Sequence, residues 1–167
     1  EIGHRTPVFQ AIMDEARSLV RELMQLNSDH EVLFLHGGAS TQFMQVPMNL
    51  LNEKDTAAFS DTGVWATKAI KEAKLFGNVE IVCSGKESGY HALPKDFAVP
   101  NGARYFHITT NNTIHGTQWT KIPQVSIPMV ADMSSDILRR VVDFNSFDLI
   151  YAVARQNMGL AEANFVV

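Results

Sequence analysis

Residues 127–159 read IPMVADMSSDILRRVVDFNSFDLIYAVARQNMG, and this stretch is the most informative part of the chain. Its first apolar run ends in Asp132 and is followed by a polar turn. A second apolar run, from Leu149 to Ala154, leads into a polar loop. Both runs have the length and the flanking residues of buried strands. Because open α/β sheets bind ligands at the carboxyl ends of their strands, we expect Asp132 and the second loop to face one cleft.

The rest of the chain alternates predicted helices with predicted strands. Thr6 suits the N-terminal cap of the first helix, Ser40 or Thr41 that of the second, and Gly77 the C-terminal cap of the third. This alternation predicts a largely parallel or mixed α/β sheet that is flanked by helices on both faces. The expected helices cover residues 7–27, 40–51 and 65–76, and the expected strands cover residues 31–35, 57–60, 79–83, 104–109, 125–131, 149–154 and 163–167.

Composition narrows the class of protein. The 167 residues are the size of one domain, and a net charge of −4 argues against nucleic-acid binding, which needs clustered basic residues. Cys83 is the single cysteine, so we expect no internal disulfide and a buried strand residue at that position. No apolar run approaches the roughly 20 residues of a membrane helix, and the histidines lack metal-ligand spacing. We therefore expect no membrane partner, no metal site and a cytoplasmic location.

An acid after one strand and a lysine after the next would suit pyridoxal phosphate. In such a site the acid holds the pyridinium nitrogen and the lysine forms a Schiff base with the aldehyde. The acid is present as Asp132, whereas the second loop carries Arg155 and Gln156.

Characteristic segments recur along the chain: GHR at 3–5, HGGASTQF at 36–43, VPMNLL at 46–51, DTGVWATKAIKEAK at 61–74, NNTIHG at 111–116 and VADMSSDIL at 130–138. In this order the segments resemble phosphoserine aminotransferases, a family of fold-type-I pyridoxal-phosphate enzymes. The resemblance implies the large cofactor-binding domain of a homodimer that moves an amino group between glutamate and 3-phosphohydroxypyruvate in serine biosynthesis. Its small-molecule partners would be phosphoserine, glutamate and their keto acids.

Both ends of the sequence look cut. The chain opens at once in helix-like sequence and stops inside the strand-like run ANFVV, whereas chains of the family continue beyond both points. We therefore expect residues 1–167 to be part of the large, pyridoxal-phosphate-binding domain, without the small C-terminal domain.

A turn with two glycines could form a binding site for the cofactor phosphate. Gly37 and Gly38 join a predicted strand to a predicted helix, whose first N–H groups can bind an anion. A plain capped turn fits the same residues. The resemblance places Ala39 and Ser40 in contact with the phosphate.

Three further residues have an ordinary interpretation and a cofactor-binding one. Trp65 could be a core residue, but the matching tryptophan of the family stacks on the pyridine ring. Thr113 could stabilise its own turn, but the matching threonine holds the ring hydroxyl. Asp132 could cap the turn that follows it, but the matching aspartate pairs with the protonated ring nitrogen.

His4 and Arg5 match a pair that binds the anionic groups of the substrate across the dimer interface. An exposed arginine is usually only solvated, although its planar fork suits carboxylate and phosphate. Their presence implies a homodimer. Arg155 adds a cation that could help to hold the phosphate.

The family pattern fails at its reactive lysine. Gln156 occupies that position, and an amide cannot attack an aldehyde. The sequence leaves three hypotheses open: a phosphoserine aminotransferase with an altered loop, a non-catalytic relative that binds the cofactor or a phosphate, and an inactive structural fragment.

Overall fold

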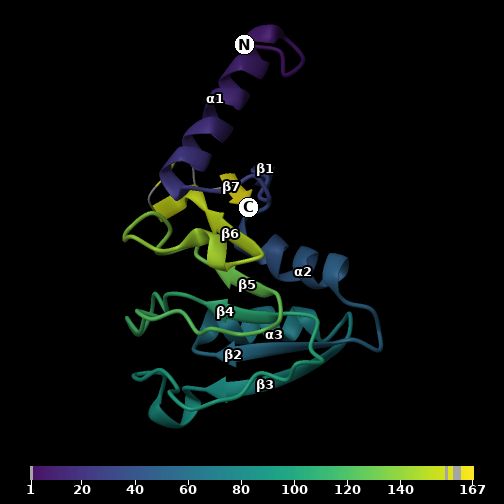
Figure 1. Cartoon of the computed structure of the whole chain (residues 1–167), viewed down its shortest axis with the longest axis vertical. Helices are drawn as coiled ribbons and strands as arrows, with labels where there is room; N and C mark the ends of the chain where they lie inside the picture. The colour runs from purple at the N-terminus through teal and green to yellow at the C-terminus, as the bar shows by residue number, and fades with distance from the viewer. Residues whose placement is uncertain (1, 157, 160–162) are drawn as a thin grey trace.

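A mixed seven-stranded sheet organises the part of the chain that the structure describes. The computed structural model describes residues 2–156, 158–159 and 163–167, and the strands lie in the order β1-β7-β6-β5-β4-β2-β3 (Figure 1). Strands β6, β5, β4, β2 and β3 are parallel, whereas β7 runs antiparallel to its neighbours β6 and β1. This confirms the predicted mixed α/β sheet. The strands are β1 (Leu33–His36), β2 (Thr56–Asp61), β3 (Asn78–Ser84), β4 (Phe106–Thr109), β5 (Met129–Asp132), β6 (Leu149–Val153) and β7 (Ala163–Val166).

The first helix begins as predicted and ends early. Thr6 Oγ1 accepts a hydrogen bond from the Phe9 N–H at 3.3 Å, which confirms the expected cap. The helix stops at Met24, because Gln25 adopts a left-handed conformation with φ of 52°. The described helices are α1 (Pro7–Met24), α2 (Gly38–Leu50), α3 (Val64–Ala73) and the 3₁₀ turns η1 (Lys86–Ser88), η2 (Phe144–Ser146) and η3 (Ala154–Gln156).

The ends of α2 and α3 differ from the prediction. Gly37, rather than Ser40 or Thr41, caps α2, and it does so with φ of 101°. A Cβ atom at Gly37 would lie 2.4 Å from Thr41 Oγ1, so only glycine fits. The third helix ends before Gly77, where a Cβ atom would lie 2.8 Å from the Asn52 carbonyl oxygen. Close packing therefore explains why both positions are glycine. The spacing of residues in the sequence does not predict these contacts.

The two faces of the sheet are covered differently. Helices α2 and α3 pack on one face, where the buried residues include Phe43, Val46, Phe59, Ile70, Tyr105 and Tyr151. The other face is covered by the last turns of α1 and by irregular connections, and its buried residues include Val20, Met24, Phe106, Trp119, Ile137 and Phe147. Helices were expected on both faces. The connection at 84–103 covers part of the second face in place of a helix, since its Leu93, Phe97 and Val99 pack against the core.

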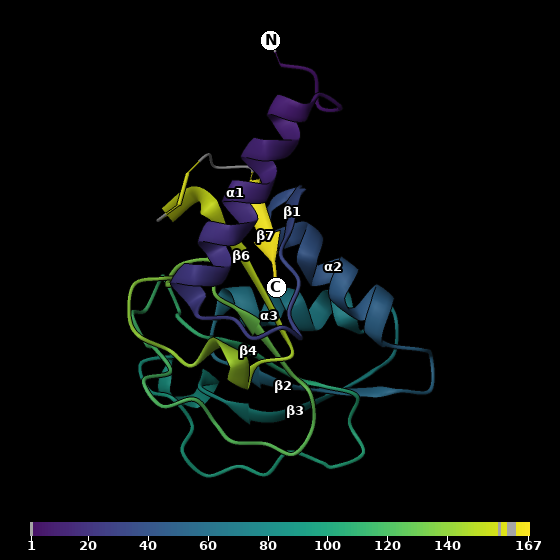
Figure 2. The same ribbon diagram turned by 45° about the horizontal axis from the view of Figure 1, so that its top comes forward.

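Helix α1 projects beyond the sheet and places the N-terminus at its outer end (Figures 1 and 2). Its apolar residues Val8, Ile12 and Leu19 are exposed. The opposite end is fastened to the body, because Asn145 Nδ2 donates to the Gln25 carbonyl at 3.0 Å. Within the described ranges, no helix combines the length and the apolar character that a membrane crossing requires.

Candidate functional site

A cleft of about 320 Å³ opens at the carboxyl ends of the central strands. The last residues of β4 and β5, Thr109 and Asp132, lie on its wall, together with the first turns of α2 and α3. Ligand sites of open α/β sheets form at this edge. The lining residues are Gly38, Ala39, Ser40, Phe43, Trp65, Thr109, Asn111, Thr113, Ile114, Asp132, Ser134, Ser135, Val153 and Arg155.

Most of the site residues predicted from the sequence meet in this cleft. The ones that line it are Ala39, Ser40, Trp65, Thr113, Asp132 and Arg155. His4 and Arg5 do not line it; both are exposed and precede the outer end of α1. Gln156 is the last residue of η3, directly after Arg155, and its side chain lies outside what the structure describes. The chain therefore assembles the predicted cofactor residues but holds the predicted substrate pair elsewhere.

Asp132 is the buried acid of the cleft, with 4% of its surface exposed. Its Oδ1 accepts a hydrogen bond from the Ser134 N–H at 3.0 Å, so the turn-capping interpretation is correct. The same carboxylate lines the cleft, and no cation among the described residues pairs with it. Burial raises the pKa of Asp132 to about 6, and Asp136 adds to the rise, whereas hydrogen bonds from Ser134 oppose it. A positively charged ligand group would relieve this cost.

The start of α2 provides an anion-binding surface. Gly37 and Gly38 have φ of 101° and 68°, and a Cβ atom at Gly38 would meet no atom within 4 Å. The first N–H groups of a helix have no partner inside the helix and carry a partial positive charge. Arg155 lines the same cleft and adds a full positive charge. This combination suits a phosphate group.

One contact joins the two segments that carry Trp65 and Thr113. Trp65 lies in the first turn of α3, just after Gly63, whose φ is 155°. A Cβ atom at Gly63 would lie 2.5 Å from Asn112 Nδ2, and that Nδ2 donates to the Thr62 carbonyl at 2.7 Å. The start of α3 is therefore attached to the loop that carries Thr113. This close approach explains the glycine before the tryptophan.

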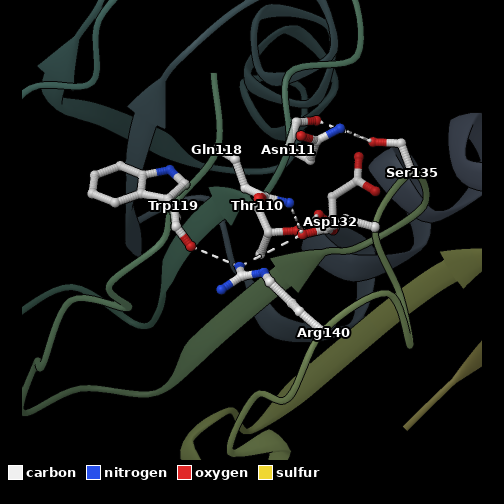
Figure 3. A network of polar contacts seen from close by, with 8 residues as sticks. Thr110, Asn111, Gln118, Trp119, Asp132, Ser135 and Arg140 are labelled. Atoms are coloured by element: carbon white, nitrogen blue, oxygen red, sulfur yellow. Dashed lines mark hydrogen bonds and ion pairs between the residues drawn. The ribbon is translucent and has the colours of Figure 1, made fainter. Parts of the chain in front are cut away.

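Sequence reasoning missed several polar residues that surround Asp132 (Figure 3). Asn111 Nδ2 donates to Ser135 Oγ at 2.9 Å, and both residues line the cleft. The Thr110 N–H donates to the Asp132 carbonyl at 3.0 Å. These residues belong to the polar runs TTNN and SSD directly after β4 and β5. Their position after two adjacent strands is the signal that could have identified them.

Two buried ionisable groups outside the cleft, His107 and Cys83, are neutral. The His107 ring stacks on Phe59 with centroids 4.8 Å apart, and its Nε2 lies 2.8 Å from Tyr151 Oη. Burial lowers the pKa of His107 to about 3. Burial also raises the pKa of Cys83 to about 12, so this strand residue is a thiol, and its predicted burial is confirmed.

Comparisons with known proteins place the chain in a family. The phosphoserine aminotransferase of Flavobacterium psychrophilum is 53% identical over the whole chain, which covers 47% of that relative. A phosphoserine aminotransferase solved in a study of radiation damage to its Schiff base matches with a TM-score of 0.96 and 43% identity, over 99% of this chain and 48% of the other. The PLP-bound phosphoserine aminotransferase from Trichomonas vaginalis matches with a TM-score of 0.88 and 30% identity, over 99% and 48%.

The chain spans about half the length of the curated relatives that it matches. The sequence pattern described as Aminotransferase class-V matches residues 1–161. The chain belongs to the class-V aminotransferase family.

Proposed function

We propose that this chain is part of a phosphoserine aminotransferase and that its cleft binds pyridoxal phosphate. The name of the 53% identical relative and the PLP-bound structure support this proposal. The observation that carries it is the convergence of a buried unpaired acid, an indole and a helix N-terminus on one cavity. Each of these features matches a different part of the cofactor.

The residues of the cleft fit the cofactor group by group. The Asp132 carboxylate would pair with the protonated ring nitrogen, and the Trp65 indole would stack on the ring. The Thr113 hydroxyl would bond the ring hydroxyl. The backbone N–H groups at Ala39 and Ser40 would bind the phosphate, with Arg155 as a second cation. When bound, the cofactor supplies an electron sink for amino transfer.

The proposed reaction is amino transfer between glutamate and 3-phosphohydroxypyruvate, which yields phosphoserine and 2-oxoglutarate for serine biosynthesis. Both substrates are anionic, and guanidinium binds such groups with two parallel hydrogen bonds. We propose that His4 and Arg5 act on the cleft of a second copy in a homodimer. Their exposed position beyond α1 supports this, since they do not reach the cleft of their own chain.

Gln156 limits what the chain can do by itself. Its amide is not a nucleophile, so a covalent link to the cofactor at this position is not possible. Arg155 cannot replace a lysine, because a guanidinium group does not form a Schiff base with an aldehyde. We therefore propose that the chain holds the cofactor reversibly, through the contacts of the cleft alone.

We further propose that residues 1–167 form part of the large domain of a longer cytoplasmic subunit. The coverage of 47% of the relative supports this. The sheet itself would provide the cofactor cleft, and the remainder of such a subunit would complete the substrate site.

Titration of the chain with pyridoxal phosphate tests the proposal. We expect saturable quenching of tryptophan fluorescence, reversal on dialysis and no adduct after borohydride treatment. A Trp119→Phe variant is the control, because it leaves Trp65 as the single reporter among the two tryptophans. Absence of saturable binding would contradict the cofactor site. Fluorescence that stays unquenched in Trp119→Phe would contradict the stacking role of Trp65.

The same experiment with Gln156→Lys tests the position of the missing lysine. We expect borohydride to fix a cofactor-sized mass at position 156 in this variant only. A fixed adduct in the unchanged chain, for example at Lys68, whose Nζ lies 4.4 Å from the Trp65 ring centroid, would contradict reversible binding. It would support a substitute amine instead.

A further inference from the structure

A second buried acid, Asp136, lies one turn after Asp132 and has 5% of its surface exposed. Its two carboxylate oxygens are both engaged. Thr110 Oγ1 donates to Oδ1, and Gln118 Nε2 donates to Oδ2 at 3.0 Å. Arg140 Nη2 lies 3.6 Å from the same Oδ2. Asp136 therefore has the ion pair that Asp132 lacks.

These contacts join the segment after β4 to the segment after β5 (Figure 3). Thr110 and Gln118 belong to the segment that carries Thr113, whereas Arg140 belongs to the segment that follows β5. Arg140 Nη2 also donates to the Trp119 carbonyl at 2.6 Å. Thr110 Oγ1 lies 3.1 Å from the Asp132 carbonyl, so the same hydroxyl reaches the backbone of one acid and the side chain of the other.

We propose that Asp136 is a positioning residue, which ties the Thr113 segment to the turn after β5 and so fixes the place and the charge environment of the Asp132 carboxylate. The proposal rests on the proposed function, in which Asp132 pairs with the ring nitrogen of the cofactor. Asp136 is not a lining residue of the cleft, so it acts through Asp132 and not on the ligand.

The charges around Asp132 predict the direction in which its pKa shifts when Asp136 or Arg140 is replaced. Tyr151 faces Asp132 from β6, Arg155 lines the cleft with it, and Asp136 lies in the turn that follows. The Asp136 carboxylate raises the pKa of Asp132, because like charges disfavour ionisation. Arg140 offsets part of that negative charge. Removing Asp136 or Arg140 should therefore move the pKa of Asp132 in opposite directions.

The first test measures the pKa of Asp132 in the 167-residue chain without ligand. Carbon-13 NMR of labelled aspartates provides it, with Asp132→Asn to assign the signal. We expect Asp136→Asn to lower this pKa and Arg140→Gln to raise it. A general loosening of the fold would admit water and lower the pKa in both variants. Shifts of the same sign, or none, would overturn the proposal.

Arg139→Gln is the matched control for Arg140→Gln. Both variants lose one positive charge from adjacent positions. The Arg139 side chain is exposed and makes no hydrogen bond or ion pair among the described residues. We expect the pKa of Asp132 to stay close to its original value in Arg139→Gln. An equal shift in both arginine variants would show that net charge, and not the Asp136 pair, is the cause.

The second test measures affinity for pyridoxal phosphate. We expect Asp136→Asn to weaken it about tenfold, a size typical of losing one hydrogen bond to a charged group. Thr110→Val should weaken it similarly, and Thr110→Ser should restore it, which keeps the proposal testable if Asp136→Asn fails to fold. Unchanged affinity in Thr110→Val would overturn the positioning role. If the unchanged chain does not bind the cofactor, the proposed function fails, while the ligand-free pKa measurements still decide the role of Asp136.

Discussion

Asp132 and His107 are buried ionisable residues on the adjacent parallel strands β5 and β4, yet their surroundings differ. His107 lies within the core, stacked on Phe59 and hydrogen-bonded to Tyr151, and its pKa of about 3 keeps it neutral. Asp132 lies where its strand ends, with a pKa of about 6 and no described cation beside it. The core therefore keeps its histidine neutral, whereas the carboxylate at the sheet edge has no described cation to compensate its charge.

The two residues should therefore affect stability with opposite signs as the pH changes. The pKa of Asp132 rises from 3.8 to about 6 on folding, so its ionisation destabilises the ligand-free fold as the pH increases through that range. The pKa of His107 falls from 6.5 to about 3, so this residue destabilises the fold as the pH decreases from 6.5.

The largest expected effect comes from Asp132→Asn. Affinity for pyridoxal phosphate should fall about a hundredfold, because the buried ring nitrogen loses its charge partner. The ligand-free chain should become more stable at pH 7 by about 2 kcal/mol, since an uncompensated charge disappears. Fluorescence titration and urea denaturation measure the two effects. At pH 4 the gain in stability should shrink, and a gain that persists there would contradict the electrostatic cause.

An intermediate effect is expected from His107→Phe. The Tyr151 hydroxyl loses its partner inside the core, which should reduce the free energy of unfolding by about 2 kcal/mol. Affinity for pyridoxal phosphate should stay within about twofold, because His107 does not line the cleft. The double variant with Tyr151→Phe should recover part of the stability. If the affinity of His107→Phe fell by much more than twofold, His107 would contribute to the ligand site, and the separation between core and cleft would be wrong.

The smallest effect is expected from Ser40→Ala. In the proposed site the phosphate is bound mainly by backbone N–H groups at the start of α2. This substitution leaves them in place, so affinity should fall only about threefold. Ser40→Pro is the contrasting variant: proline fits the first turn of a helix but lacks the N–H group. Its affinity for the cofactor should fall further than that of Ser40→Ala. Equal losses in the two variants would assign the phosphate contact to the side chain.

Much of the fold could be predicted because apolar runs and helical periodicity are local features. Strands β3, β4, β6 and β7 lie close to their predicted ranges, and Thr6 caps α1 as expected. Strand β5 (Met129–Asp132) begins later than the predicted range of 125–131. The pairing of β7 between β6 and β1 was not predicted, because strand direction depends on long-range contacts. The same reason hides the role of Gly77, where a Cβ atom would meet backbone atoms of Asn52 and Asp55 from another segment.

The position of the cleft could be predicted because the carboxyl ends of parallel strands lie at the same edge of a sheet. Asp132 and the loop with Arg155 follow neighbouring strands, so their meeting could be inferred. The resemblance, rather than the pattern, singled out Trp65 and Thr113. Asn111, Ser135 and Asp136 were missed, because their partners come from the register of β4 against β5. That register cannot be read from either strand alone.

The antiparallel pairing of β1 with β7 has a consequence for the order of folding. Leu33 lies opposite Val166, so a strand made early in translation receives its neighbour only when the last described residues emerge. Until then β1 presents unpaired backbone groups, which other chains can join. Closing so long a loop makes this a late and slow step. In a nascent chain arrested before residue 163, β1 would lack its β-sheet partner. We expect chaperones to bind such a chain at this exposed strand.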